Sequence, residues 1–150
     1  MPDRIILPNE VLLSRAVEVV EQGRIAIIPV KGRSMDPFIR GNKDCVELFP
    51  FTDLEVGDVV LAEVSPGHYL LHRIFAFDGT EGVVLMGDGN ICNTEYCLRK
   101  NVKARALVVI SPSGKRKRLD SRSMKVASSL WRKLLPVRGI LLRIFHRIFS

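Results

Sequence analysis

The sequence predicts a mainly β domain, a twisted sheet or partly closed β-barrel with one helix before it and a basic helical tail after it. Several short runs rich in Val, Ile and aromatic residues are separated by Gly, Pro and Asp turns, a pattern typical of antiparallel sheets. Apolar residues also recur at helical spacing near both ends of the chain. With 150 residues, 47% of them hydrophobic, the chain is long enough for one domain with its own core.

Residues 8–23 predict the N-terminal helix, because apolar side chains repeat there at helical spacing and Gly23 closes the segment. A short β-rich run at 24–30 follows and leads directly to Gly32 and Ser34. Further strands are expected at residues 45–49, 59–64, 68–77, 83–86 and 102–110.

The turn at 111–114 divides the sequence into a domain at 1–110 and a basic linker with an amphipathic helical tail at 111–150. Helices are expected at 123–135 and 137–149, and Pro136 separates them. Apolar side chains with flanking arginines suit a helix that lies on a membrane surface. A helix that packs on the domain or on a partner fits the same pattern. The apolar face of the second helix comprises Val137, Ile140, Leu141, Ile144, Phe145 and Ile148, with Arg138 and Arg147 off it.

The net charge of +7 is concentrated in the tail, because residues 115–150 hold eleven Lys or Arg and one acid, Asp120. A basic surface favours an anionic partner. We therefore expect a peripheral membrane contact through residues 123–149. Nucleic acid is disfavoured as a partner, because aromatic residues make up only 7% of the chain and do not interleave with the basic run.

Cysteine usage and hydropathy favour a cytoplasmic or peripheral membrane location. The three cysteines, Cys45, Cys92 and Cys97, are an odd and low number, which is typical of reduced thiols. They lack the adjacent Cys/His pair of a zinc site, so no metal or cofactor is expected. The first eight residues are too short for a signal peptide. No stretch reaches the roughly 18 uncharged apolar residues of a spanning helix.

Ser34 and His72 are the residues that point to chemistry. A serine hydroxyl becomes a nucleophile when a neighbouring base takes its proton, and histidine is an effective base near neutral pH. Ser34 lies in a Gly- and Pro-flanked turn after a strand, where backbone N–H groups at Gly32 and Ser34 could bind an oxyanion. A simple polar turn and a core histidine fit the same residues.

Asp88 is the first candidate for the acid that orients His72, since a carboxylate fixes the tautomer of an imidazole and stabilises its charged form. It lies in the short loop Gly87-Asp88-Gly89-Asn90. Glu95, seven residues later, is the alternative acid.

Four motifs in this order resemble the signal peptidase I superfamily, which also holds the self-cleaving SOS-type repressors. They are Gly32-x-Ser34-Met35-x-Pro37, Gly57-Asp58-Val59-Val60, His72-Arg73-Ile74 and Gly87-Asp88-Gly89-Asn90, spread over residues 24–110. His72 stands where many bacterial members have lysine. The chain therefore resembles most the Ser–His branch found in the endoplasmic reticulum, in archaea and in sporulation-type enzymes.

The resemblance implies the β fold of the signal peptidase catalytic domain and a serine endopeptidase activity that needs no metal. Ser34 would attack a peptide carbonyl, His72 would act as general base and then acid, and Asp88 or Glu95 would orient His72. The substrate would be a peptide or pre-protein with small residues beside the cut. The alternative is a non-catalytic β-domain that serves as a binding or assembly module on a membrane or nucleic acid.

Overall fold

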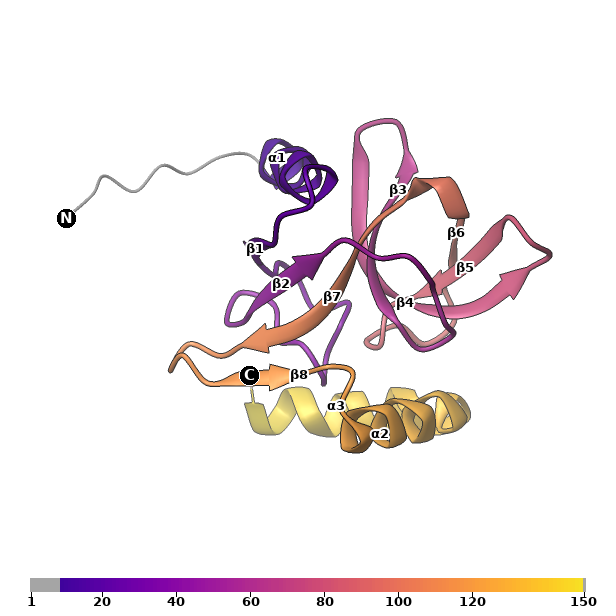
Figure 1. The fold of residues 1–150 in the computed structure, drawn as a ribbon. Helices are drawn as coiled ribbons and strands as arrows, with labels where there is room; N and C mark the ends of the chain where they lie inside the picture. The colour runs from indigo at the N-terminus through magenta and orange to yellow at the C-terminus, as the bar shows by residue number, and fades with distance from the viewer. Residues whose placement is uncertain (1–8, 150) are drawn as a thin grey trace.

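The computed structural model describes residues 9–149 and shows a mainly antiparallel sheet of eight strands with three α-helices (Figure 1). Along the sheet the order is β1-β2-β7-β3-β4-β5-β6, and β8 pairs with the end of β7 on the edge opposite β2. The sheet is not closed into a barrel. The strands are β1 (Ala26–Pro29), β2 (Cys45–Phe49), β3 (Val59–Ser65), β4 (His68–Asp78), β5 (Gly82–Met86), β6 (Glu95–Leu98), β7 (Val102–Ile110) and β8 (Arg116–Arg118).

Helix α1 (Asn9–Glu21) packs its apolar side against the strands at one end of the molecule (Figure 1). Its buried residues, Leu13, Ala16, Val17 and Val20, recur at the spacing of one helical face. They join the larger of two buried apolar clusters, which includes residues of β1, β2, β3 and β7. This confirms the predicted N-terminal helix, apart from Pro8, which lies outside the described residues.

Helices α2 (Arg122–Lys133) and α3 (Arg138–Phe149) lie together at the opposite end of the molecule from α1 (Figure 1). The Ser121 hydroxyl caps α2 by accepting a hydrogen bond from the backbone N–H of Met124. A short 3-10 turn, η2 (Leu135–Val137), contains Pro136 and joins the helices. Both predicted tail helices are therefore confirmed. None of the helices in the described part of the chain has the length and apolar character needed to cross a membrane.

Two strands were not predicted. β6 occupies a segment for which no element was predicted, and β8 occupies the basic run expected as a linker. All three side chains of β8 are exposed, and the strand is held by its pairing with β7 and by ion pairs of Arg116 with Glu47 and Arg118 with Asp120. The segment after 114 therefore begins as part of the sheet.

Candidate active site

Ser34 lies in the long loop between β1 and β2, on a turn held by backbone hydrogen bonds. The N–H of Asp36 donates to Arg33 O over 3.2 Å, and the N–H of Phe38 donates to Met35 O over 3.1 Å. The Met35 side chain is buried beneath the turn, which leaves the neighbouring Ser34 half-buried. Gly32 precedes it with φ +73°, in the left-handed region that glycine adopts without strain.

The Ser34 N–H donates no backbone hydrogen bond within residues 9–149. Backbone N–H groups that point into a site without a protein partner are the usual donors of an oxyanion hole. This geometry is compatible with the role expected for Ser34 and the Gly32 turn.

His72 lies on β4, opposite Val60 of β3, and is 6% exposed. Burial lowers the pKa of His72, and the charges of Glu95 and, to a smaller extent, Asp88 oppose that shift. Its Nδ1 is buried without a hydrogen-bond partner among the described residues. The imidazole is therefore held in its neutral form, the form that accepts a proton.

The Gly87–Asn90 loop brings Ser34 and His72 to one place. The N–H of Gly89 donates to the carbonyl oxygen of Ser34 over 2.8 Å. A Cβ atom at Gly87 would overlap with the Ser34 carbonyl and lie 3.2 Å from His72 Nε2, and one at Gly89 would overlap with the Arg33 carbonyl. Both glycines are required by this close backbone approach. Three of the four sequence motifs therefore meet at a single junction.

The expected contact of Asp88 with His72 is not formed. Asp88 is 2% exposed, and its two carboxylate oxygens accept from Nε and Nη2 of Arg73 over 2.8 and 2.7 Å. The physical reason is that a guanidinium offers two parallel donors to a carboxylate, a stronger match than one imidazole N–H. In this structure Asp88 holds Arg73 and the loop, and its effect on His72 is through charge alone.

Glu95, the alternative acid, lies at the start of β6 and is exposed. Its charge raises the pKa of His72 more than that of Asp88 does. Within the described residues it makes no hydrogen bond to His72, and none joins the Ser34 hydroxyl to His72. Neither acid orients the imidazole in this structure.

Ser34 and His72 line the same groove, of about 130 Å³. On one side of this groove lies β1, which within residues 9–149 pairs with β2 alone and leaves its other edge unpaired there. On the other side lie residues 68–72 of β4. They pair with β3 on one edge, and their other edge is unpaired among the described residues because β5 pairs with residues 73–78. The groove walls between these edges are polar and apolar in nearly equal parts. The apolar part includes Leu13, Ile28, Val30, Met35, Leu61 and Leu71.

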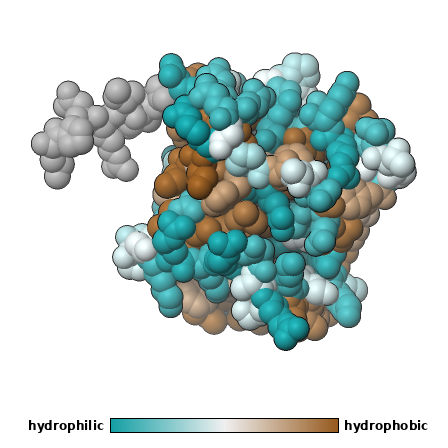
Figure 2. All heavy atoms as spheres, in the orientation of Figure 1, coloured by the Kyte–Doolittle hydropathy of each residue, from teal (hydrophilic) through white to brown (hydrophobic). Residues whose placement is uncertain are grey.

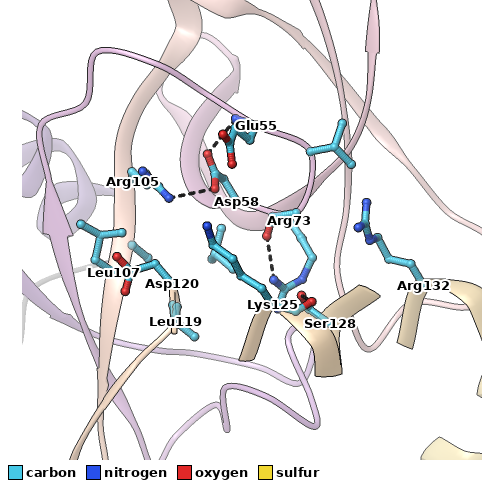
Figure 3. Close-up of a pocket in the computed structure, with 14 residues that line it drawn as sticks. Glu55, Asp58, Arg73, Arg105, Leu107, Leu119, Asp120, Lys125, Ser128 and Arg132 are labelled. Atoms are coloured by element: carbon cyan, nitrogen blue, oxygen red, sulfur yellow. Dashed lines mark hydrogen bonds and ion pairs between the residues drawn. The ribbon is translucent and has the colours of Figure 1, made fainter. Parts of the chain in front are cut away.

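The Gly57-Asp58 motif has a structural part in this arrangement (Figure 3). Asp58 accepts from the backbone N–H of Glu55 over 2.8 Å and pairs with Arg105 over 3.1 Å. The carbonyl oxygen of Gly57 accepts from Nη1 of Arg73 over 2.8 Å. Arg73 thus links this turn to Asp88, and the motif positions the loop that contacts Ser34.

Three tail residues that the sequence did not single out also hold the site loops. Trp131 of α2 donates its indole N–H to the carbonyl oxygen of Asp88 over 2.8 Å, and Arg138 of α3 donates to that of Asn90 over 3.0 Å. His146 Nε2 lies 2.9 Å from Oδ2 of Asp36, two residues after Ser34. The tail sequence carries no signal for these contacts, since the residues are distant from the motifs along the chain.

Comparisons of the chain with protein-family models, with curated proteins and with solved structures found no match. The geometry described above is therefore what bears on function.

Proposed function

We propose that this chain is a serine endopeptidase of the signal peptidase type, with Ser34 as nucleophile and His72 as general base. One observation carries the proposal: the Ser34 and His72 side chains line one groove, between two strand edges that are unpaired among the described residues. An extended peptide binds such an edge by completing the backbone hydrogen bonds of a strand. The finer fold proposed here is the partly closed barrel of the signal peptidase catalytic domain.

The reaction is acyl transfer in two steps. Ser34 Oγ attacks the peptide carbonyl while His72 takes its proton, and the Ser34 N–H stabilises the oxyanion. His72 then gives that proton to the leaving amine, and water hydrolyses the ester by the same route in reverse. Arg73 and Asp88 hold the loop against Ser34 without touching the substrate. The small groove volume favours small side chains next to the cut.

The test is cleavage of a peptide library by wild type and by Ser34→Ala. We expect Ser34→Ala to lose cleavage by about a thousandfold or more, since members of a nucleophile–base pair act as a unit. Ser65→Ala is the matched control, because Ser65 is exposed at the end of β3 and does not line the groove. Equal cleavage by Ser34→Ala and wild type would contradict the proposal.

The unpartnered Nδ1 of His72 favours a second candidate, a non-catalytic module that binds an extended peptide in the same groove. A base without an orienting acid loses most of its catalytic advantage. Wild type that binds library peptides without cutting any of them would support this module and exclude the peptidase.

A further inference from the structure

The two C-terminal helices have a buried inner side that is fully engaged with the domain. Met124 and Trp131 of α2 and Arg138 and Leu142 of α3 are buried. Trp131 also packs edge-on against Phe38, with ring centroids 6.2 Å apart. The sequence allowed the tail helices either to pack on the domain or to lie on a membrane. They pack on the domain, and this contact uses one side of each helix.

The opposite side of both helices exposes a continuous apolar series. Half of the sixteen large apolar side chains that are exposed within residues 9–149 fall between 126 and 149. Apart from Phe149, they are three or four residues apart, which places those of α2 and those of α3 on one side of each helix, with Leu134 and Val137 at the junction. Hydrophobic atoms reach the lower edge of Figure 2, where Figure 1 places α2 and α3. We call this series the outer helical face: Val126, Leu130, Leu134, Val137, Ile140, Ile144 and Ile148.

The cations beside the outer helical face are exposed and lack acidic neighbours on the same helices. Residues 122–149 contain no Asp or Glu. The inner cation, Arg138, is buried, and burial lowers its pKa. The exposed cations are Arg122, Lys125, Lys133, Arg143 and Arg147.

We propose that the outer helical face docks on an anionic membrane surface. Apolar side chains flanked by Lys and Arg enter the headgroup region, where apolar burial and attraction to anionic lipid act together. A second copy of the chain fits poorly, because a symmetric contact would bring the exposed cations of both copies together. Each helix has 12 residues, so both lie along the surface.

Docking on this face would fix the orientation of the groove relative to the lipid. The inner sides of the same helices hold the Asp88–Asn90 loop and Asp36. A peptide substrate emerging from the bilayer would meet a groove whose height above the lipid is set by α2 and α3. The membrane contact itself does not depend on the proposed peptidase activity and is measured without it.

The experiment is co-sedimentation of the full chain with vesicles of phosphatidylcholine, alone or mixed with phosphatidylglycerol. Wild type is expected to bind the mixed vesicles more strongly. The triple variant Leu130→Ser/Ile140→Ser/Ile144→Ser is expected to bind the mixed vesicles more weakly than wild type, by a factor of about ten or greater. Lys133→Glu/Arg143→Glu is expected to lose the preference for phosphatidylglycerol.

Matched controls lie on the rest of the molecule. Val11→Ser removes an exposed apolar side chain from α1, at the opposite end of the molecule. Arg15→Glu/Lys100→Glu reverses two exposed cations, one in α1 and one between β6 and β7. Both controls should bind as wild type does, and circular dichroism verifies that every variant is folded. Equal binding by wild type and the triple variant would overturn the proposal. So would dimerisation in the absence of lipid that the triple variant abolishes, because a second copy would then cover the face.

Discussion

His72 is the titratable side chain on which the proposed chemistry depends, and its surroundings decide the pH at which it is a base. Burial lowers the pKa of His72, against the opposing charges of Glu95 and Asp88. The unfolded chain has the ordinary histidine pKa of about 6.5. Below that value the unfolded state binds a proton that the folded state does not. Protonation therefore favours unfolding.

From this difference we predict that wild type loses stability as the pH falls from about 6.5 toward the lower pKa of folded His72. His72→Gln should lack this part of the pH dependence, whatever its stability at pH 8. The measurement is the free energy of unfolding in urea between pH 5 and 8 for both proteins. Parallel curves over that range would contradict a lowered pKa. The two proteins differ only at residue 72, so the difference between their curves is assigned to His72.

Backbone contact between two loops positions the serine turn, in addition to the side-chain contacts that hold these loops. The loop after β5 lies against the serine turn so closely that Gly87 and Gly89 leave no room for a Cβ atom. The N–H of Gly89 donates a hydrogen bond to the Ser34 carbonyl, and this bond fixes the turn that contains Ser34. The loop is therefore a rigid support, and its glycines are conformational requirements of the site.

Gly89→Ala is predicted to destabilise the fold by about 2 kcal/mol or more, because the added methyl meets the Arg33 carbonyl and one of the two loops must move. Peptide cleavage should fall with it, since the Ser34 turn moves too. Gly139→Ala is the matched control: it lies in α3, and its new methyl would meet only the flexible Ile91 side chain at 3.3 Å. Thermal unfolding measures both. Similar melting temperatures for the two variants would show that the loops do not pack as described.

The difference between strands with buried side chains and strands with exposed ones explains how much of the fold the sequence could predict. Strands that bury several apolar residues were predicted: β3 begins with four consecutive buried residues, and buried residues alternate along β7. β6 buries only Cys97, and β8 buries nothing, so neither produces such a pattern. A strand is recognisable from the sequence when its buried side chains form an apolar pattern. Strands held mainly by backbone pairing and ion pairs lack that pattern.

Some features of the candidate site could likewise be predicted from the sequence, and others could not. The motifs that meet around Ser34 could be predicted because their residue types and order are distinctive. The partner of Asp88 could not, because Arg73 and His72 are adjacent on β4 and the sequence does not show which one the loop carboxylate reaches. The tail contacts were also unpredictable, since Trp131 and Asp88 are 43 residues apart along the chain.

At the scale of the whole molecule, the contacts of α2 and α3 with the site loops predict that the helices and the sheet unfold together. Trp131 is the single tryptophan of the chain and lies at this junction, with the Arg138 guanidinium 5.2 Å from its ring centroid. Its fluorescence and the far-UV circular dichroism should therefore change at the same urea concentration.

Leu142→Ala, which opens a cavity on the inner side of α3, should lower both midpoints equally and cost about 2–3 kcal/mol. Ile144→Ala, on the exposed side of the same helix, should leave both nearly unchanged. A Trp131 transition that precedes the loss of sheet signal would instead mean that the helix pair detaches on its own, and the site loops would then lose their support before the sheet unfolds.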